Sequence, residues 1–147
     1  MRVGPKENCN LRLLIAKIIG SAGSIVPCRI TEPFLVLSEV ENLVRNMIGD
    51  KFTPTELAEV RDPEDGRAVA NVADLTFGEY VRLLEAPARW ARLGLEIDRT
   101  LFCREVNRVR VIRNNVMHFD PDGIAPEDLI TLRRFAQFLK RLEQLRA

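Results

Sequence analysis

Apolar side chains recur at helical spacing along most of the chain, beginning at Pro33. Between Phe34 and Ile48 they fall at i, i+3, i+4 and i+7, and Gly49 follows as a stop signal. This pattern predicts a first core helix of about four turns. Its predicted core positions are Leu37, Val40, Leu43, Val44, Met47 and Ile48. Residues 1–31 lack a comparable pattern, and we interpret them as an N-terminal arm or the remnant of a neighbouring domain.

Two capping signals predict the next helices. In Thr53-Pro54-Thr55-Glu56 a hydroxyl lies three residues before a glutamate, with proline at the first helical position, so a short helix should run to about Val60. A polar loop follows, to about Asp74. Thr76-Phe77-Gly78-Glu79 repeats the capping pattern and predicts a helix with Phe77, Tyr80, Val81 and Leu84 on its inner face. Pro87 should end this helix and begin a further turn that contains Trp90.

Two longer helices complete the prediction. Asp98 is a suitable N-cap for a helix that reaches about His118, and 119–123 contains the sequence Phe-Asp-Pro-Asp-Gly, which should break it. The last helix should start at Pro126, with Leu129, Leu132, Phe135, Ala136, Leu139 and Leu142 as its apolar stripe. No convincing strand pattern follows residue 31. We therefore expect an all-α bundle of about four to five helices over residues 32–147.

Composition narrows the functional classes. The 147 residues are 46% apolar and 29% charged, which is typical of one globular domain. Lys+Arg total 22 against 21 Asp+Glu, so bulk charge favours neither nucleic-acid nor membrane binding. No apolar run approaches the roughly 20 residues of a membrane-spanning helix, because Arg12 and Lys17 interrupt the most apolar stretch. We expect a soluble, cytoplasmic protein without a membrane partner.

Metal and cofactor binding receive no support from the sequence. The three cysteines, Cys9, Cys28 and Cys103, share no CxxC spacing and accompany only one histidine. Carboxylates such as Glu39 and Glu41, or the group at 62–65, have no histidine nearby. We expect no metal site and no cofactor.

The predicted helix 98–118 has an unusual polar face. With Arg113 set at zero on a helical wheel, Val109, Ile112 and Val116 lie between about 260° and 320°. The polar side chains lie between about 60° and 140°. These polar residues are Asn107, Arg110, Asn114 and His118. The helix has five arginines against Asp98 and Glu105, and it contains the only histidine of the chain.

This combination of residues suits RNA cleavage without a metal. Histidine exchanges protons near neutral pH, and arginine presents a planar charged fork to phosphate oxygens. His118 would move the proton of the 2′-hydroxyl or of the leaving 5′-oxygen, Arg113 would stabilise charge on the phosphorane, and Asn114 would orient either group. One histidine cannot act as both acid and base in one step, so a symmetric homodimer would supply the second copy. Arg110 and Asn107 are candidate RNA-binding residues.

The stretch Arg113-Asn114-Asn115-Val116-Met117-His118 resembles the R-x4–6-H signature of the HEPN superfamily, including the polar residue after the arginine. Three further stretches are similar to HEPN domains that follow CBS-domain pairs in bacterial proteins. They are the predicted helix start at 75–80, the arginine-rich sequence before the motif, and residues 119–122 after the helix. The resemblance spans about residues 32–145, and this chain has no CBS pair. It implies a helical bundle, often dimeric, in which two motifs form a metal-independent endoribonuclease that leaves a 2′,3′-cyclic phosphate. It also implies an antitoxin or another regulatory partner.

Other interpretations of the same residues stay open. Arg113 could bridge Asp120 or Asp122, His118 could cap the helix C-terminus, and Asn114 could hydrogen-bond across a dimer interface. Arg110 could be an ordinary surface arginine. Some HEPN proteins are binding or dimerisation modules without nuclease activity, so the motif alone does not decide between an enzyme and an interaction module.

Overall fold

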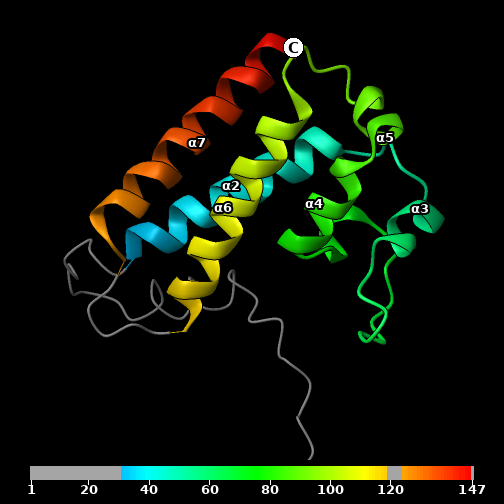
Figure 1. Ribbon diagram of the computed structural model, residues 1–147, viewed down its shortest axis with the longest axis horizontal. Helices are drawn as coiled ribbons and strands as arrows, with labels where there is room; N and C mark the ends of the chain where they lie inside the picture. Colours follow the sequence, from blue (N-terminus) through cyan, green and yellow to red (C-terminus); the bar gives the residue numbers. More distant parts are fainter. Residues whose placement is uncertain (1–30, 119–123, 147) are drawn as a thin grey trace, which may run out of the picture.

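The computed structural model describes residues 31–118 and 124–146, and every regular element in these two ranges is a helix (Figure 1). The elements in chain order are α2 (Thr31–Ile48), α3 (Pro54–Glu59), the 3₁₀ turn η1 (Val72–Asp74), α4 (Phe77–Glu85), α5 (Pro87–Arg92), α6 (Arg99–Met117) and α7 (Pro126–Arg146). The predicted all-α fold is therefore confirmed. None of the described helices is both long and apolar enough to cross a membrane.

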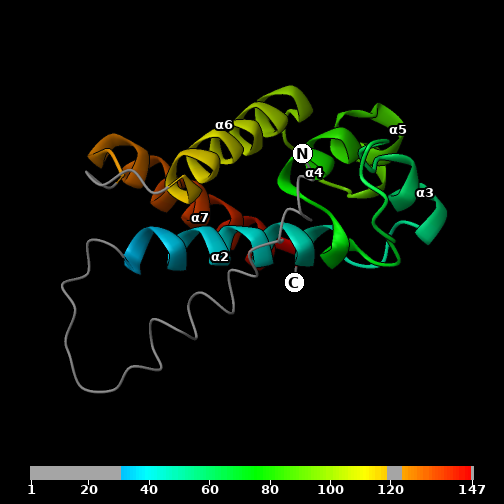
Figure 2. The same cartoon turned by 90° about the horizontal axis from the view of Figure 1, so that it is seen from below.

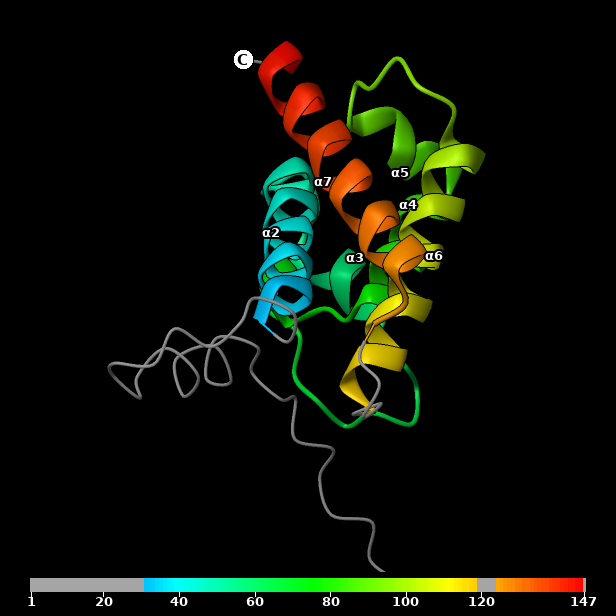
Figure 3. The ribbon, with the colours of Figure 1, turned by 90° about the vertical axis from the view of Figure 1, so that its left-hand side faces the viewer.

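Helices α2 and α7 pack side by side and run in the same direction, with α6 on the other side of α7 (Figures 1 and 3). Polar contacts between α2 and α7 occur at matching positions along the two parallel helices. Glu32 pairs with Arg133, Glu39 Oε1 lies 2.6 Å from Lys140 Nζ, and Arg146 Nη1 donates to the Met47 carbonyl at 3.2 Å. Such exposed pairs contribute little energy. The buried Leu37, Val44 and Leu139 supply the main stabilisation.

Helix α6 joins this pair to the second part of the bundle. Helices α3, α4 and α5 gather beside one end of α2, and α4 packs against α6 (Figure 2). The shared core includes Phe77, Tyr80 and Leu84 of α4 and Val106 and Val109 of α6, all buried. Trp90 of α5 contacts Phe102 of α6, with ring centroids 5.1 Å apart. These contacts fix the first turn of α4 against the C-terminal half of α6.

The capping box of α4 is buried, and it holds the preceding polar loop. Glu79 accepts hydrogen bonds from the backbone N–H groups of Thr76 (2.7 Å) and Asp62 (3.1 Å) and from Arg67 Nη2 (2.9 Å to each carboxylate oxygen). Burial alone would raise the pKa of Glu79, but the bonds from Thr76, Arg67 and Asp62 outweigh it and lower that pKa. The loop 61–75 is thereby tied to α4.

The predicted elements agree closely with the observed ones. The helix predicted from Phe34 begins three residues earlier, at Thr31, so the proposed boundary at 31/32 falls inside its first turn. The caps at Thr53, Thr76 and Asp98 form as predicted. Tyr80, Trp90 and Phe102 are core residues, as expected, whereas Leu43, Val116, Leu129 and Leu142 are only half-buried. The predicted break at 119–123 and the arm at 1–30 lie outside the described residues.

Candidate functional site

Helix α6 positions all five candidate site residues. Its N-cap Asp98 accepts a hydrogen bond from the Leu101 N–H at 2.7 Å. Val106, Val109 and Ile112 are buried and fix the rotation of the helix about its axis. His118 is the C-cap, and its backbone N–H donates to the carbonyls of Asn114 (3.2 Å) and Asn115 (3.3 Å). The candidate residues therefore sit on a rigid element.

Arg113 lies against the first residue of α4. Its guanidinium carbon is 5.8 Å from the centroid of the Phe77 ring, within the range of a cation–π contact. The side chain is half-buried. Its Nε is fully enclosed and has no hydrogen-bond partner within the part of the chain that the structure describes. A buried N–H of this kind costs about 1–3 kcal/mol if it stays unsatisfied, so the arrangement calls for a functional explanation.

The Arg110 side chain lies over the first turn of α4, next to Arg113. Its Nε donates to Asn107 Oδ1 at 2.9 Å, which holds the two candidate residues together. A Cβ added at Gly78 would lie 3.7 Å from Arg110 Cδ, so the arginine side chain runs close over the first turn of α4. Two arginines thus flank the N-terminus of a nine-residue helix, where the helix dipole is positive. Glu79 already caps this helix start, so the two guanidinium groups are what would attract an anion here.

Asn114 and His118 are exposed and lie one turn apart, so both face solvent on the same side of α6. Val111 lies between them and Asn107 on the helix surface and is 47% exposed. Neither side chain forms a hydrogen bond within the residues that the structure describes. His118 has the C-cap position that the capping interpretation requires.

The structure divides the predicted polar face into two parts. Asn107, Asn114 and His118 are exposed as expected, whereas Arg113 turns toward the core and stacks on Phe77. Arg113 and His118 are five residues apart, so their directions differ by about 140° around the helix. Within one copy they do not converge. The alternative in which Arg113 bridges Asp120 or Asp122 lies outside the described residues.

Two contributors to the site were not predicted. Phe77 supports the Arg113 guanidinium, and Gly78 lies under the Arg110 side chain. The sequence identified Phe77 as a residue of the inner helix face and Gly78 only as part of a capping pattern. Their contact with α6 depends on how the two helices cross, and no local signal reports that crossing.

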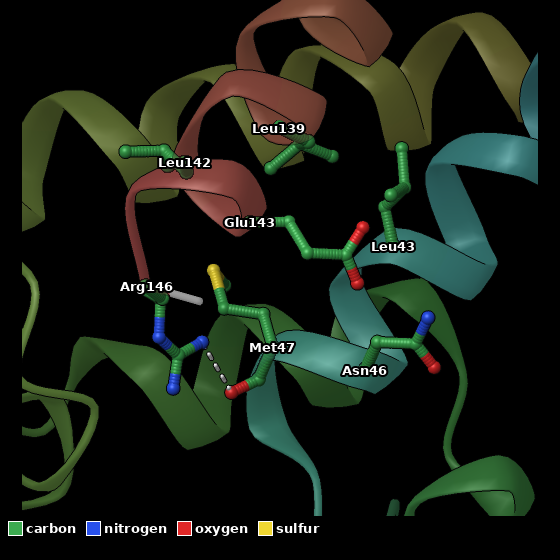
Figure 4. A pocket seen from close by; sticks show the side chains of 7 residues that line it. All are labelled: Leu43, Asn46, Met47, Leu139, Leu142, Glu143 and Arg146. Carbon is green, nitrogen blue, oxygen red and sulfur yellow. Dashed lines mark hydrogen bonds between the residues drawn. The ribbon is translucent and has the colours of Figure 1, made fainter.

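A small cavity of about 310 Å³ lies elsewhere, between the C-terminal ends of α2 and α7 (Figure 4). Arg146 spans it to the Met47 carbonyl, and Glu143 and Asn46 line its rim. Arg146 caps a carbonyl in the last turn of α2 here, which is a structural role. Among the residues that the structure describes, no group of three or more His, Cys, Asp or Glu side chains could hold a metal ion.

Comparison with models of known protein families, with curated proteins and with solved structures finds no match to this chain. The likeness to HEPN domains therefore rests on the motif and on the helical setting described above.

Proposed function

We propose that this chain is a HEPN-type endoribonuclease that cleaves single-stranded RNA without a metal ion. The observation that supports this most is the environment of Arg113. Its guanidinium has a buried Nε without a partner in the described residues, and Arg110 and the N-terminus of α4 lie beside it. A phosphate at the surface beside these two arginines would accept charge-assisted hydrogen bonds from their guanidinium groups.

The proposed reaction is an internal transfer at phosphorus. His118 of one copy removes the proton from a ribose 2′-hydroxyl, and the 2′-oxygen attacks the adjacent phosphorus. The bond from phosphorus to the 5′-oxygen breaks as the second copy's His118, in its protonated form, donates a proton to that oxygen. The products are a 2′,3′-cyclic phosphate and a 5′-hydroxyl. Arg113 stabilises the extra charge on the phosphorane, Asn114 orients a histidine, and Arg110 and Asn107 contact the RNA backbone.

Two copies are required because Arg113 and His118 of one copy point in different directions. A second α6 packed against the exposed side of the first would bring its own imidazole beside Asn107, Asn114 and His118 of the first copy. Val111, exposed at the centre of this polar side, is the apolar residue on which such a contact would be centred. The homodimer is therefore part of the proposed mechanism.

A cleavage assay tests the proposal. Labelled single-stranded RNA is incubated with protein in excess EDTA, and the wild type is compared with His118→Ala, Arg113→Ala and the control Arg104→Ala. Arg104 is on the same helix with a side chain 69% exposed. We expect His118→Ala and Arg113→Ala to lose about 100-fold or more of the rate, and Arg104→Ala to keep it. Equal background in all four proteins would contradict the nuclease proposal.

A second measurement tests the shared site. Val111→Glu places a charge at the proposed contact, whereas Leu145→Glu makes the same change at a residue that is 82% exposed near the end of α7. We expect Val111→Glu to abolish cleavage and Leu145→Glu to leave it unchanged. Specific activity should also rise with protein concentration. A concentration-independent rate that survives Val111→Glu would mean that one copy acts alone.

The alternative is a binding module without catalysis, acting on nucleotide or RNA within a regulatory or toxin–antitoxin system. The divergence of Arg113 and His118 within one copy favours it. In that case RNA binding would depend on Arg110 and Arg113 but not on His118, and no cyclic phosphate would form.

A further inference from the structure

A surface groove lies between α6 and α7, on the side of α6 that faces away from the candidate site. It has a volume of about 620 Å³. Helices α6 and α7 run in opposite directions along the two sides of this groove (Figures 1 and 3). The lining is Ile97, Asp98, Leu101, Phe102, Glu105, Arg108, Thr131, Arg134, Phe135 and Phe138.

Apolar side chains on both walls of the groove are open to solvent. Leu101 on α6 is 50% exposed and Phe138 on α7 is 39% exposed, above a floor formed by the buried Phe102 and Phe135. The ring centroid of Phe102 lies 5.9 Å from that of Phe135 and 6.4 Å from that of Phe138. Exposed apolar side chains gathered in one concave surface are typical of an interaction site.

The charges around the groove are balanced. Glu105 and Arg108 lie on α6, Asp98 is the N-cap of α6, and Arg134 lies on α7. Among the described residues no salt bridge links Glu105 to Arg134, and neither Arg108 nor Arg134 has a carboxylate partner at salt-bridge distance. Glu105 contacts only its neighbour Arg104, at 3.6 Å. These charges are therefore available to an incoming surface.

The register of the two helices makes this surface complementary to itself. The contacts of Phe102 with Phe135 and Phe138 set Leu101 level with Phe138 and Glu105 level with Arg134, because α6 and α7 run in opposite directions. A twofold axis along the groove would lay α6 of one copy over α7 of the other. Leu101 would then meet the partner's Phe138, and Glu105 would meet the partner's Arg134, each pair occurring twice.

We infer that this groove is an interface between two copies of the chain, separate from the contact proposed for RNA cleavage. Leu101 and Glu105 lie roughly 100–180° around α6 from Asn107, Asn114 and His118, and Arg108 lies roughly 80–120° from them. The groove interface leaves the candidate site open. A chain that uses both contacts assembles beyond a dimer.

Charge swapping tests this inference in the Val111→Glu background, where the other contact is removed. Sedimentation at micromolar concentration should show a dimer for Val111→Glu. Adding Glu105→Arg, or separately Arg134→Glu, should raise the dimer dissociation constant about tenfold or more, because like charges then face each other. Combining both changes restores opposite charges and should return the constant to within about threefold of its starting value.

The fold of each variant must be checked before its dimer dissociation constant is interpreted. Helical circular dichroism and the melting temperature of every variant show whether its fold is intact, and both altered positions are at the surface. If Val111→Glu is a monomer at 100 micromolar, the groove accepts some other partner, such as a foreign helix or a small apolar ligand, and the inference is wrong. It is also wrong if the double swap fails to restore the dimer. RNA cleavage by the charge-swap variants with Val111 intact should match the wild type, so this result is independent of the nuclease proposal.

Discussion

Arg67 and Arg113 both lie near the start of α4, but they differ in how completely their hydrogen-bond donors are satisfied. Arg67 is paired: Nη2 bonds both oxygens of the buried Glu79 at 2.9 Å, Nε bonds Asp65 at 3.1 Å, and Nη1 donates to the Asp74 carbonyl. Arg113 stacks on Phe77 with a buried Nε that has no partner in the described residues. The hydrogen-bond donors of Arg67 are satisfied by other parts of the fold, whereas Arg113 has a donor without a partner in the described residues.

The difference distinguishes structural from functional charge. A buried ion pair whose hydrogen bonds are complete resists the removal of either partner, because the remaining charge would lose its compensation. A buried donor without a partner costs the folded state free energy, so its side chain is not held in place for stability alone. Arg67 therefore belongs to the scaffold, and Arg113 is the better candidate for phosphate binding.

The largest expected effect is at Glu79. Glu79→Gln removes the charge that compensates Arg67, and we expect the free energy of unfolding to fall by about 2–4 kcal/mol in urea denaturation. The control is Glu56→Gln, since Glu56 has the same position in the capping box of α3 and pairs with Arg92 at 2.6 Å, but in solvent. Its loss should be clearly smaller. Equal losses at the two positions would mean that burial does not distinguish them.

The same pair predicts a pH dependence. The pKa of Glu79 is lowered in the folded protein from its ordinary value of 4.5, so the folded state favours the carboxylate. The stabilisation is present above pH 4.5 and is lost as the pH falls through the lowered folded-state pKa. The melting-temperature difference between wild type and Glu79→Gln, measured from pH 3 to 7, should be constant near neutrality and shrink below about pH 4.5. A difference that stays constant to pH 3 would contradict the lowered pKa.

Removal of Arg113 should have a smaller effect on folding and a large effect on function. Arg113→Met keeps the volume over Phe77 and deletes the unsatisfied N–H, against the loss of a cation–π contact of about 0.5–1 kcal/mol. We expect stability within about 1 kcal/mol of the wild type, measured by thermal unfolding, together with loss of RNA cleavage. A loss as large as that of Glu79→Gln would place Arg113 in the scaffold with Arg67.

The smallest expected effect is a gain at Gly78. A Cβ there would make an ordinary contact with Arg110 Cδ at 3.7 Å, and positive φ values occur at Gly49 and Gly94 rather than at Gly78. Gly78→Ala should therefore raise the stability by about 0.5 kcal/mol through lower backbone entropy of the unfolded chain. A loss of stability in thermal melts would show that Arg110 needs the open space above this turn.

Helix positions were predictable because their signals are local. The capping hydroxyls of Thr53 and Thr76 and the N-cap carboxylate of Asp98 lie within three residues of the N–H groups that they satisfy. The start of α2 was predicted three residues late, because the apolar pattern begins at Phe34 whereas the first turn, Thr31–Pro33, is outside that pattern. The candidate residues of α6 were predicted from their type and spacing. Their nuclease role stays a prediction.

The helices, most of the core and the arginines, asparagines and histidine of α6 follow from residue type and helical period, so they could be read from the sequence. Which charges are satisfied depends on how the helices pack. The crossing of α4 and α6 turned Arg113 onto Phe77, and the folding of the loop 61–75 brought Arg67 to Glu79. The separation of α6 from α7 left Leu101 and Phe138 exposed beside Glu105 and Arg134. These outcomes depend on distances between segments far apart in the chain, and local sequence patterns do not specify such distances.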